Sequence, residues 1–182
     1  MIEQIDIANV LFLDIETVPG HPDYEELDDE MQELWYTKSR SLARKSADEM
    51  EEDEAAAMYF ERAGIYAEFG KIICISVGIV HRSKEDNRLR VRLKSFASEN
   101  EAEVLRDFSQ LLSQFYPDPN RHFLCGHNIK EFDIPYICRR MVVNQLDFPE
   151  PLNISGKKPW ETRHLLDTME MWKFGDIKNY TS

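Results

Sequence analysis

The stretch from Val10 to Thr17 constrains the fold more than any other part of this sequence. It is an apolar run without glycine or proline, and its last residues include Asp14 and Glu16. Such a run predicts a buried strand, and Pro19-Gly20 predicts its end. Because strand side chains alternate between two faces, both acids lie on the same face. They also fall at the carboxyl end of the strand, where open α/β sheets bind ligands.

Two neighbouring carboxylates at the edge of a core repel each other and are costly to desolvate. A bound divalent cation relieves both problems, and Mg²⁺ or Mn²⁺ suits oxygen ligands better than zinc does. The alternative is that Asp14 and Glu16 are only polar residues at a strand end, with Asp14 accepting hydrogen bonds from turn amides. The strand alone leaves both interpretations open.

Length and composition predict one globular domain. The chain has 182 residues, of which 42% are hydrophobic and 31% are charged. It shows neither a signal peptide nor a stretch of transmembrane length, so we expect no membrane association. Its three cysteines are widely spaced and form no C-x-x-C pair, which favours free thiols in a reducing cytoplasm and argues against a zinc site.

The negative charge is concentrated in one segment. The formal net charge is −12, and residues 23–62 carry 14 acidic and 5 basic side chains. The charge argues against broad electrostatic attraction to nucleic acid, although its uneven distribution says little about the rest of the surface. We expect residues 23–64 to form an acidic insert of two helices after the first strand. A solvated arm is favoured over a lid that contacts substrate or a partner.

The remaining pattern alternates strands and helices. Further strands are predicted near residues 72, 89, 123 and 164, with helices between them. This order favours a three-layer α/β fold with a mixed sheet. Lys157, Lys158 and Arg163 form the best local basic cluster for phosphate groups, but a solvated loop explains them as well.

A second motif lies between residues 126 and 136. A short apolar strand leads into a turn at Asn128, and Asp133 precedes the Ile134-Pro135 pair that predicts the first turn of a helix. We expect Phe132 to pack inward while Asp133 faces the cleft. The amide and the acid can then converge on the carboxylates of the first strand.

The two motifs together resemble the DEDD superfamily of 3′-5′ exonucleases. The likeness is greatest to the proofreading exonuclease domain of family B DNA polymerases and to stand-alone polymerase-B-like exonucleases. Residues 68–78 and 166–176 look similar to that family too, so the resemblance spans residues 1–182 except for the insert. It implies an RNase H-like fold, two divalent ions (Mg²⁺ or Mn²⁺) and hydrolysis of DNA from single-stranded 3′ ends.

The resemblance also implies roles for individual residues. Asp14 would bridge both ions, Glu16 would bind the catalytic one, and Asp133 would act through metal-bound water on the second. These three are therefore the expected catalytic and metal-binding residues. The expected substrate-binding residues are Ile15, Thr17, Asn128 and Phe132.

The family's third motif is missing from this sequence. A Tyr or His followed by a fourth acid should lie on a C-terminal helix, but none is found before Ser182. Asp167 is a weak candidate for a late ligand, and Asp176 is better explained as a turn residue. We therefore expect an exonuclease domain that is incomplete at its C-terminus, with weak metal binding and little activity. The alternatives are a nucleic-acid- or partner-binding module of the same fold, and a nuclease that cuts internally.

Overall fold

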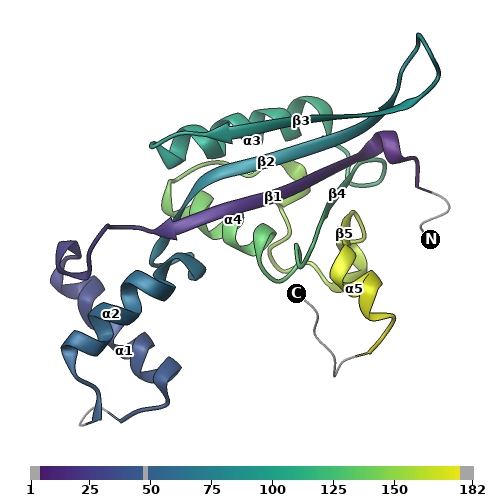
Figure 1. The fold of residues 1–182 in the computed structure, drawn as a ribbon. Coiled ribbons are helices and arrows are strands. Elements are labelled where there is room, and N and C mark those ends of the chain that lie inside the picture. The colour runs from purple at the N-terminus through teal and green to yellow at the C-terminus, as the bar shows by residue number, and fades with distance from the viewer. Residues whose placement is uncertain (1–4, 47–48, 177–182) are drawn as a thin grey trace. The chain divides into compact units, whose positions relative to one another are not determined.

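The computed structural model describes residues 5–46 and 49–176. The chain divides into two compact units, one made of residues 17–72 and the other of the chain before and after them. Figure 1 colours the chain from purple at the N-terminus to yellow at the C-terminus. Residues 177–182, the end of the region in which the third motif was sought, lie outside the described residues.

Five strands form one sheet in the order β3-β2-β1-β4-β5. β1 is parallel to β4, β4 is parallel to β5, and β2 is antiparallel to β3, so the sheet is mixed. This confirms the predicted α/β class, and each strand lies where the apolar runs predict it. The strands are β1 (Val10–Pro19), β2 (Gly70–Arg82), β3 (Leu89–Ala97), β4 (Phe123–Gly126) and β5 (Leu165–Asp167).

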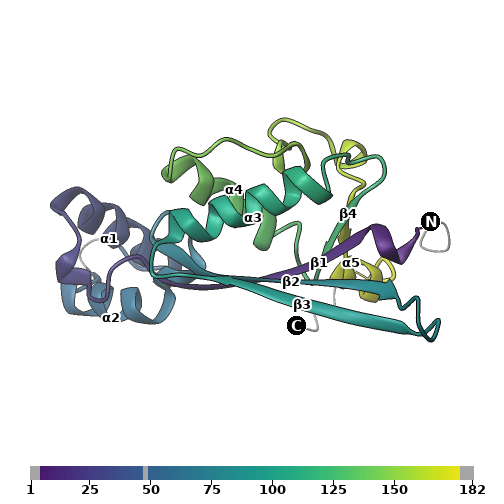
Figure 2. The same ribbon diagram turned by 90° about the horizontal axis from the view of Figure 1, so that it is seen from above.

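Two long helices cover one face of this sheet, as Figure 2 shows. They are α3 (Glu101–Phe115) and α4 (Asp133–Val143). α3 forms because its apolar residues recur at helical spacing, and Val104, Phe108 and Leu112 are all buried. The buried ion pair between Glu101 and Arg140, 2.6 Å from Oε2 to Nη2, joins α3 to α4.

A second hydrophobic cluster lies on the opposite face of β1. Val10 packs with Cys125 and Leu166, which point to the same side of their paired strands. Met171 of the short helix α5 (Thr168–Lys173) packs against this cluster. The order is therefore α3 and α4, then the sheet, then α5, which gives the predicted three layers.

Residues 17–72 contain two helices and their own aromatic core. The helices are α1 (Asp29–Ala43) and α2 (Glu52–Arg62). Trp35 is fully buried, and its Nε1 donates to the carbonyl of Ala55 at 2.8 Å. The rings of Tyr59 and Phe69 lie 5.3 and 5.0 Å from the Trp35 ring, both edge-on. The helices expected in the acidic insert are thus held together by a packed core.

Short 3₁₀ helices complete the described secondary structure. They span Ile7–Asn9, Tyr24–Glu26, Ala63–Ile65, Glu150–Leu152 and Pro159–Glu161. Within residues 5–46 and 49–176, none of the helices is long and apolar enough to cross a membrane. The three cysteines are unpaired, and Cys125 is the buried one.

Candidate active site

β1 presents Asp14 and Glu16 on one side of the sheet. Both acids are exposed, while Ile15 between them and Leu13 before Asp14 are buried. The period of two that the sequence indicates is therefore present in the structure. Ile15 was expected to contact substrate, but its side chain is only 6% exposed and points to the opposite face. The contribution to the site that the structure shows for Ile15 is its backbone N–H.

That N–H holds Asp133. Oδ1 of Asp133 accepts a hydrogen bond from the Ile15 nitrogen at 3.2 Å, across 118 positions of sequence. Asp133 is the first residue of α4 and is 3% exposed. Burial, reinforced by the negative charges of Asp14 and Asp167, raises the pKa of Asp133 to about 6. The structure therefore brings two of the three predicted acids close together.

The turn before α4 has an unusual backbone. Asn128 adopts a left-handed conformation with φ of 61°, which asparagine tolerates better than most residues. Its Oδ1 is buried and has no hydrogen-bond partner within the described part of the chain. Phe132 directly precedes α4 and is half-buried, with its ring 5.5 Å from that of Tyr136. The fold thus places Asn128 and Phe132, two of the four predicted substrate residues, on the segment that leads to Asp133.

Asp167 holds this turn in place. Its Oδ1 accepts from the backbone nitrogen of Asn128 at 3.0 Å, and its Oδ2 accepts from that of Lys130 at 3.2 Å. Oδ1 also accepts from the nitrogen of Met169 at 2.9 Å, so Asp167 caps α5 as well. Asp167 is 2% exposed. Both oxygens therefore accept hydrogen bonds from backbone amides, and the side chain clamps the Asn128 turn to the start of α5.

Sequence reasoning missed this clamp, although a signal for it exists. An aspartate placed directly before a helix is a preferred N-cap. The pattern Asp167-Thr168-Met169-Glu170 therefore predicts an N-terminal cap, but it cannot reveal the amides of the distant Asn128 turn. Asp176, the other late acid, is exposed, and its nitrogen donates to the carbonyl of Lys173 in a turn.

The acids present fit a cation site in part. Asp14 and Asp133 offer hard oxygen donors, and a divalent cation would offset their mutual repulsion. However, no group of three or more Asp, Glu, His or Cys side chains in the described residues is arranged to hold a metal ion. Glu16 is exposed further along β1, and Thr17, the remaining predicted substrate residue, belongs to the unit formed by residues 17–72.

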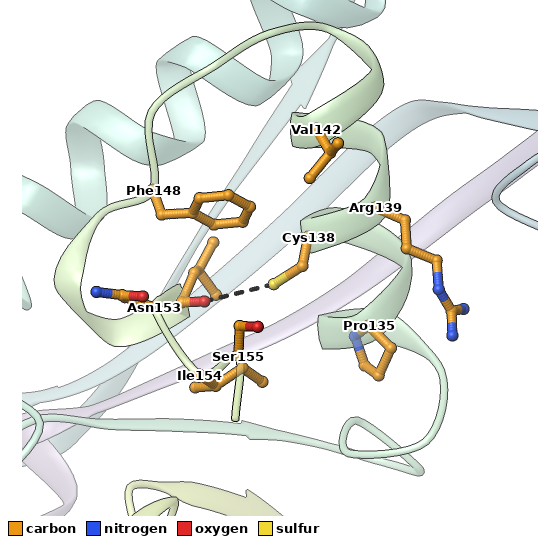
Figure 3. A pocket seen from close by; sticks show the side chains of 9 residues that line it. Pro135, Cys138, Arg139, Val142, Phe148, Asn153, Ile154 and Ser155 are labelled. Atoms are coloured by element: carbon orange, nitrogen blue, oxygen red, sulfur yellow. Dashed lines mark hydrogen bonds between the residues drawn. The ribbon is translucent and has the colours of Figure 1, made fainter. Parts of the chain in front are cut away.

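A separate cavity of about 460 Å³ lies between α4 and the loop that follows it (Figure 3). It is lined by Val142, Phe148 and Cys138, whose thiol donates to the Leu152 carbonyl at 3.5 Å. Burial raises the pKa of Cys138 to about 11, so this thiol stays protonated and unreactive. The lining contains none of the predicted site residues.

Carboxylates gathered at the end of a strand are the ligands that metal-dependent phosphodiesterases use. A comparison with known protein families identifies a family more specific than the class of metal-dependent phosphodiesterases. The chain belongs to the family of DNA polymerase family B exonuclease domains, whose sequence model matches residues 3–161.

Among solved structures, the chain is similar to the family B DNA polymerase from the hyperthermophilic archaeon Pyrobaculum calidifontis, with 18% sequence identity and a TM-score of 0.36. The match covers 75% of this chain and spans 11% of that polymerase. No curated protein sequence matches the chain.

Proposed function

We propose that this protein is a 3′-5′ exonuclease that removes nucleotides from single-stranded DNA ends with the help of Mg²⁺ or Mn²⁺, two ions being expected in a complete site. The proposal rests on one contact in a chain that belongs to an exonuclease-domain family. The hydrogen bond from Ile15 to Asp133 holds the Asp133 carboxylate beside Asp14, in the middle of the central strand β1. Glu16 completes the proposed set of catalytic and metal-binding acids.

The residues of the chain have defined tasks in this proposal. Asp14 and Asp133 supply negatively charged oxygens, and the Ile15 N–H orients one of them. Asp133 must lose its proton to bind a cation, and its raised pKa of about 6 means that protons compete with the cation for this carboxylate. A divalent ion, when bound, activates water and stabilises the leaving oxygen at the phosphorus.

We assign the terminal nucleotide to the segment around Asn128. The buried Oδ1 of Asn128 has no hydrogen-bond partner in the described residues, and we propose it as the acceptor for a donor group of the nucleotide. The half-buried ring of Phe132 and the side chain of Thr17 are the further proposed substrate contacts. Stacking on an aromatic ring tolerates any base, which suits an enzyme that degrades DNA of any sequence. The three cysteines, which form no pairing pattern, favour a reducing, cytoplasmic setting.

A second function is a catalytically incomplete module that binds nucleic acid or a protein partner and retains the fold. One observation favours it, since the described residues contain no group of three ligands arranged for a metal ion. Such a module would bind its partner without hydrolysing it.

Degradation of 5′-labelled single-stranded DNA in Mn²⁺ separates the two functions. We expect a ladder that shortens from the 3′ end and is absent both with EDTA and in Asp14→Ala. Closed circular DNA, which has no 3′ end, should remain intact. Cleavage of the circle would show an internal nuclease, and DNA that is bound but never shortened would support the binding module.

A further inference from the structure

A groove of about 740 Å³ runs along the outer edge of the sheet. It lies between the short helix Pro159–Glu161, β5 and α5. These elements belong to the C-terminal part of the chain, where Figure 1 labels β5 and α5. We call it the Trp160 groove, after the indole on one of its walls. Leu166 and Met171 contribute apolar surface to it, while Lys130 and Glu170 contribute charged groups.

The Trp160 groove combines an aromatic face with a cation. Trp160 is 59% exposed, and the Nζ of Lys158 lies 5.0 Å from the centre of its ring. Arg163 also lines the groove, and within the described residues its side chain makes neither an ion pair nor a hydrogen bond. Proteins bind single-stranded nucleic acid with such pairs, because the ring stacks on a base while the guanidinium binds a phosphate.

The local charge is compatible with an anionic ligand in spite of the acidic chain. Glu170, the exposed acid on the far wall, is already neutralised by Lys130, whose Nζ lies 2.6 Å from Oε2. The carboxylate of Glu161 accepts a hydrogen bond from the backbone nitrogen of Lys158 at 2.8 Å. The cation of Arg163 therefore lines the groove, and each acid that lines it, Glu170 and Asp167, already has a partner in Lys130 or in backbone amides.

The Trp160 groove adjoins the turn that leads to the candidate active site. Lys130 and Asp167 both line it, and Asp167 is the clamp that holds the Asn128 turn. The same turn leads directly to Asp133 at the start of α4. A strand whose 3′ end reaches the acids would thus pass over the turn and enter the groove with its next nucleotides.

We propose that the Trp160 groove binds the internal nucleotides of the single strand whose 3′ end occupies the acid site, with one base stacked on Trp160 and one phosphate on Arg163. This inference rests on the proposed function, since it extends the path of the same substrate. A protein segment is the competing occupant, and the experiment below distinguishes the two.

The test compares a long and a short oligonucleotide, each labelled with fluorescein at its 5′ end, by anisotropy in EDTA. Oligo(dT) of 12 nucleotides is long enough to span the site and the groove, whereas a trinucleotide occupies the acid site alone. Trp160→Leu should weaken binding of the long oligonucleotide by about 5- to 100-fold and leave the trinucleotide unchanged. Trp172→Leu is the matched control, because Trp172 is 68% exposed but does not line the groove.

Arg163→Gln provides a second, independent measurement. The loss of one phosphate contact should reduce the salt dependence of binding of the long oligonucleotide by about 0.7 in the logarithmic slope. Unchanged binding of the trinucleotide by both groove variants shows that they are folded. These results together would support the proposal.

Three results would overturn it. If Trp160→Leu binds the long oligonucleotide like the wild-type protein, the groove does not bind the DNA strand and a protein segment becomes its favoured occupant. The exonuclease proposal is unaffected by that result. If Trp172→Leu loses as much affinity as Trp160→Leu, the effect does not belong to the groove. If the wild-type chain neither binds nor shortens DNA, the proposed function fails and this inference fails with it.

Discussion

At the scale of single residues, the protonation of Asp133 makes the charge of the candidate site depend on pH. Its pKa is about 3.8 in the unfolded chain and about 6 in the folded protein, mainly because the carboxyl is buried. Folding therefore favours the protonated form. The associated stability is fully present below pH 3.8 and is lost as the pH rises through 6, where the fold must hold a buried negative charge.

We therefore expect Asp133→Asn to stabilise the metal-free protein at neutral pH. The amide keeps an oxygen that can accept from Ile15 but never carries the buried charge. The gain in the free energy of unfolding should be up to about 3 kcal/mol at pH 7.5 and should shrink towards zero near pH 4. Urea denaturation in EDTA at both pH values measures it.

The control for this prediction is Asp147→Asn, because Asp147 is exposed on the surface. It should change the free energy of unfolding by less than about 0.5 kcal/mol at either pH. An Asp133→Asn gain of the same size at pH 4 and pH 7.5 would contradict the raised pKa. Loss of nuclease activity in Asp133→Asn at every pH is expected in addition, since the amide is a poor ligand for a divalent cation.

At the scale of elements, Asp167 ties together segments that are distant in sequence. One carboxylate ends β5, caps α5 and accepts hydrogen bonds from two amides of the Asn128 turn. The left-handed backbone of Asn128 is thereby held by contacts outside its own segment. The geometry of the candidate site depends in this way on a residue 34 positions away from Asp133 in the sequence.

Asp167→Ala should therefore destabilise the protein by about 2–4 kcal/mol, because it removes a helix cap and leaves turn amides unsatisfied. Asp28→Ala is a suitable control, since Asp28 is an exposed cap that accepts from one nitrogen, that of Met31 at 2.8 Å. It should cost only about 1 kcal/mol. Equal losses in the two variants, measured by urea denaturation, would show that the contacts to the Asn128 turn contribute nothing.

At the scale of the whole molecule, the chain has two compact units with separate cores. Residues 17–72 are packed around Trp35, and the other unit has its helical layer packed on the sheet, with Phe108 of α3 fully buried. β1 and β2 contain residues of both units, so the chain passes between the units only through strands.

Because the cores are separate, a cavity in one should loosen mainly that unit. Trp35→Ala and Phe108→Ala should each cost about 3–5 kcal/mol locally. Hydrogen exchange should then accelerate within residues 17–72 in Trp35→Ala, and in the remaining described chain in Phe108→Ala. If either variant accelerates exchange equally throughout, the two units unfold as one.

Much of the site was predictable because it depends on local periodicity. The alternation along β1 places Asp14 and Glu16 on one face, and the Ile134-Pro135 pair marks the start of the helix that carries Asp133. The order of apolar runs also predicts the mixed sheet. Each of these features follows from spacings of two to four residues, which a sequence displays directly.

The remaining features depend on residues that are far apart in the sequence. The contact between Ile15 and Asp133 joins positions 118 apart, and the clamp by Asp167 reaches back 39 positions to Asn128. The raised pKa of Asp133 likewise depends on burial and on the charges of Asp14 and Asp167, which come from other segments. No local pattern contains such information, because these contacts exist only once the strands have paired.

By itself, the sequence determined the elements of this protein, the face on which its first two acids lie, and the family to which it belongs. The tertiary structure alone decided which carboxylates meet, which one is clamped by backbone amides, and that the acidic insert has its own aromatic core. The reason is physical: strand and helix periods are set by neighbouring residues, whereas burial, pKa shifts and hydrogen bonds between segments are set by the packing of the folded chain.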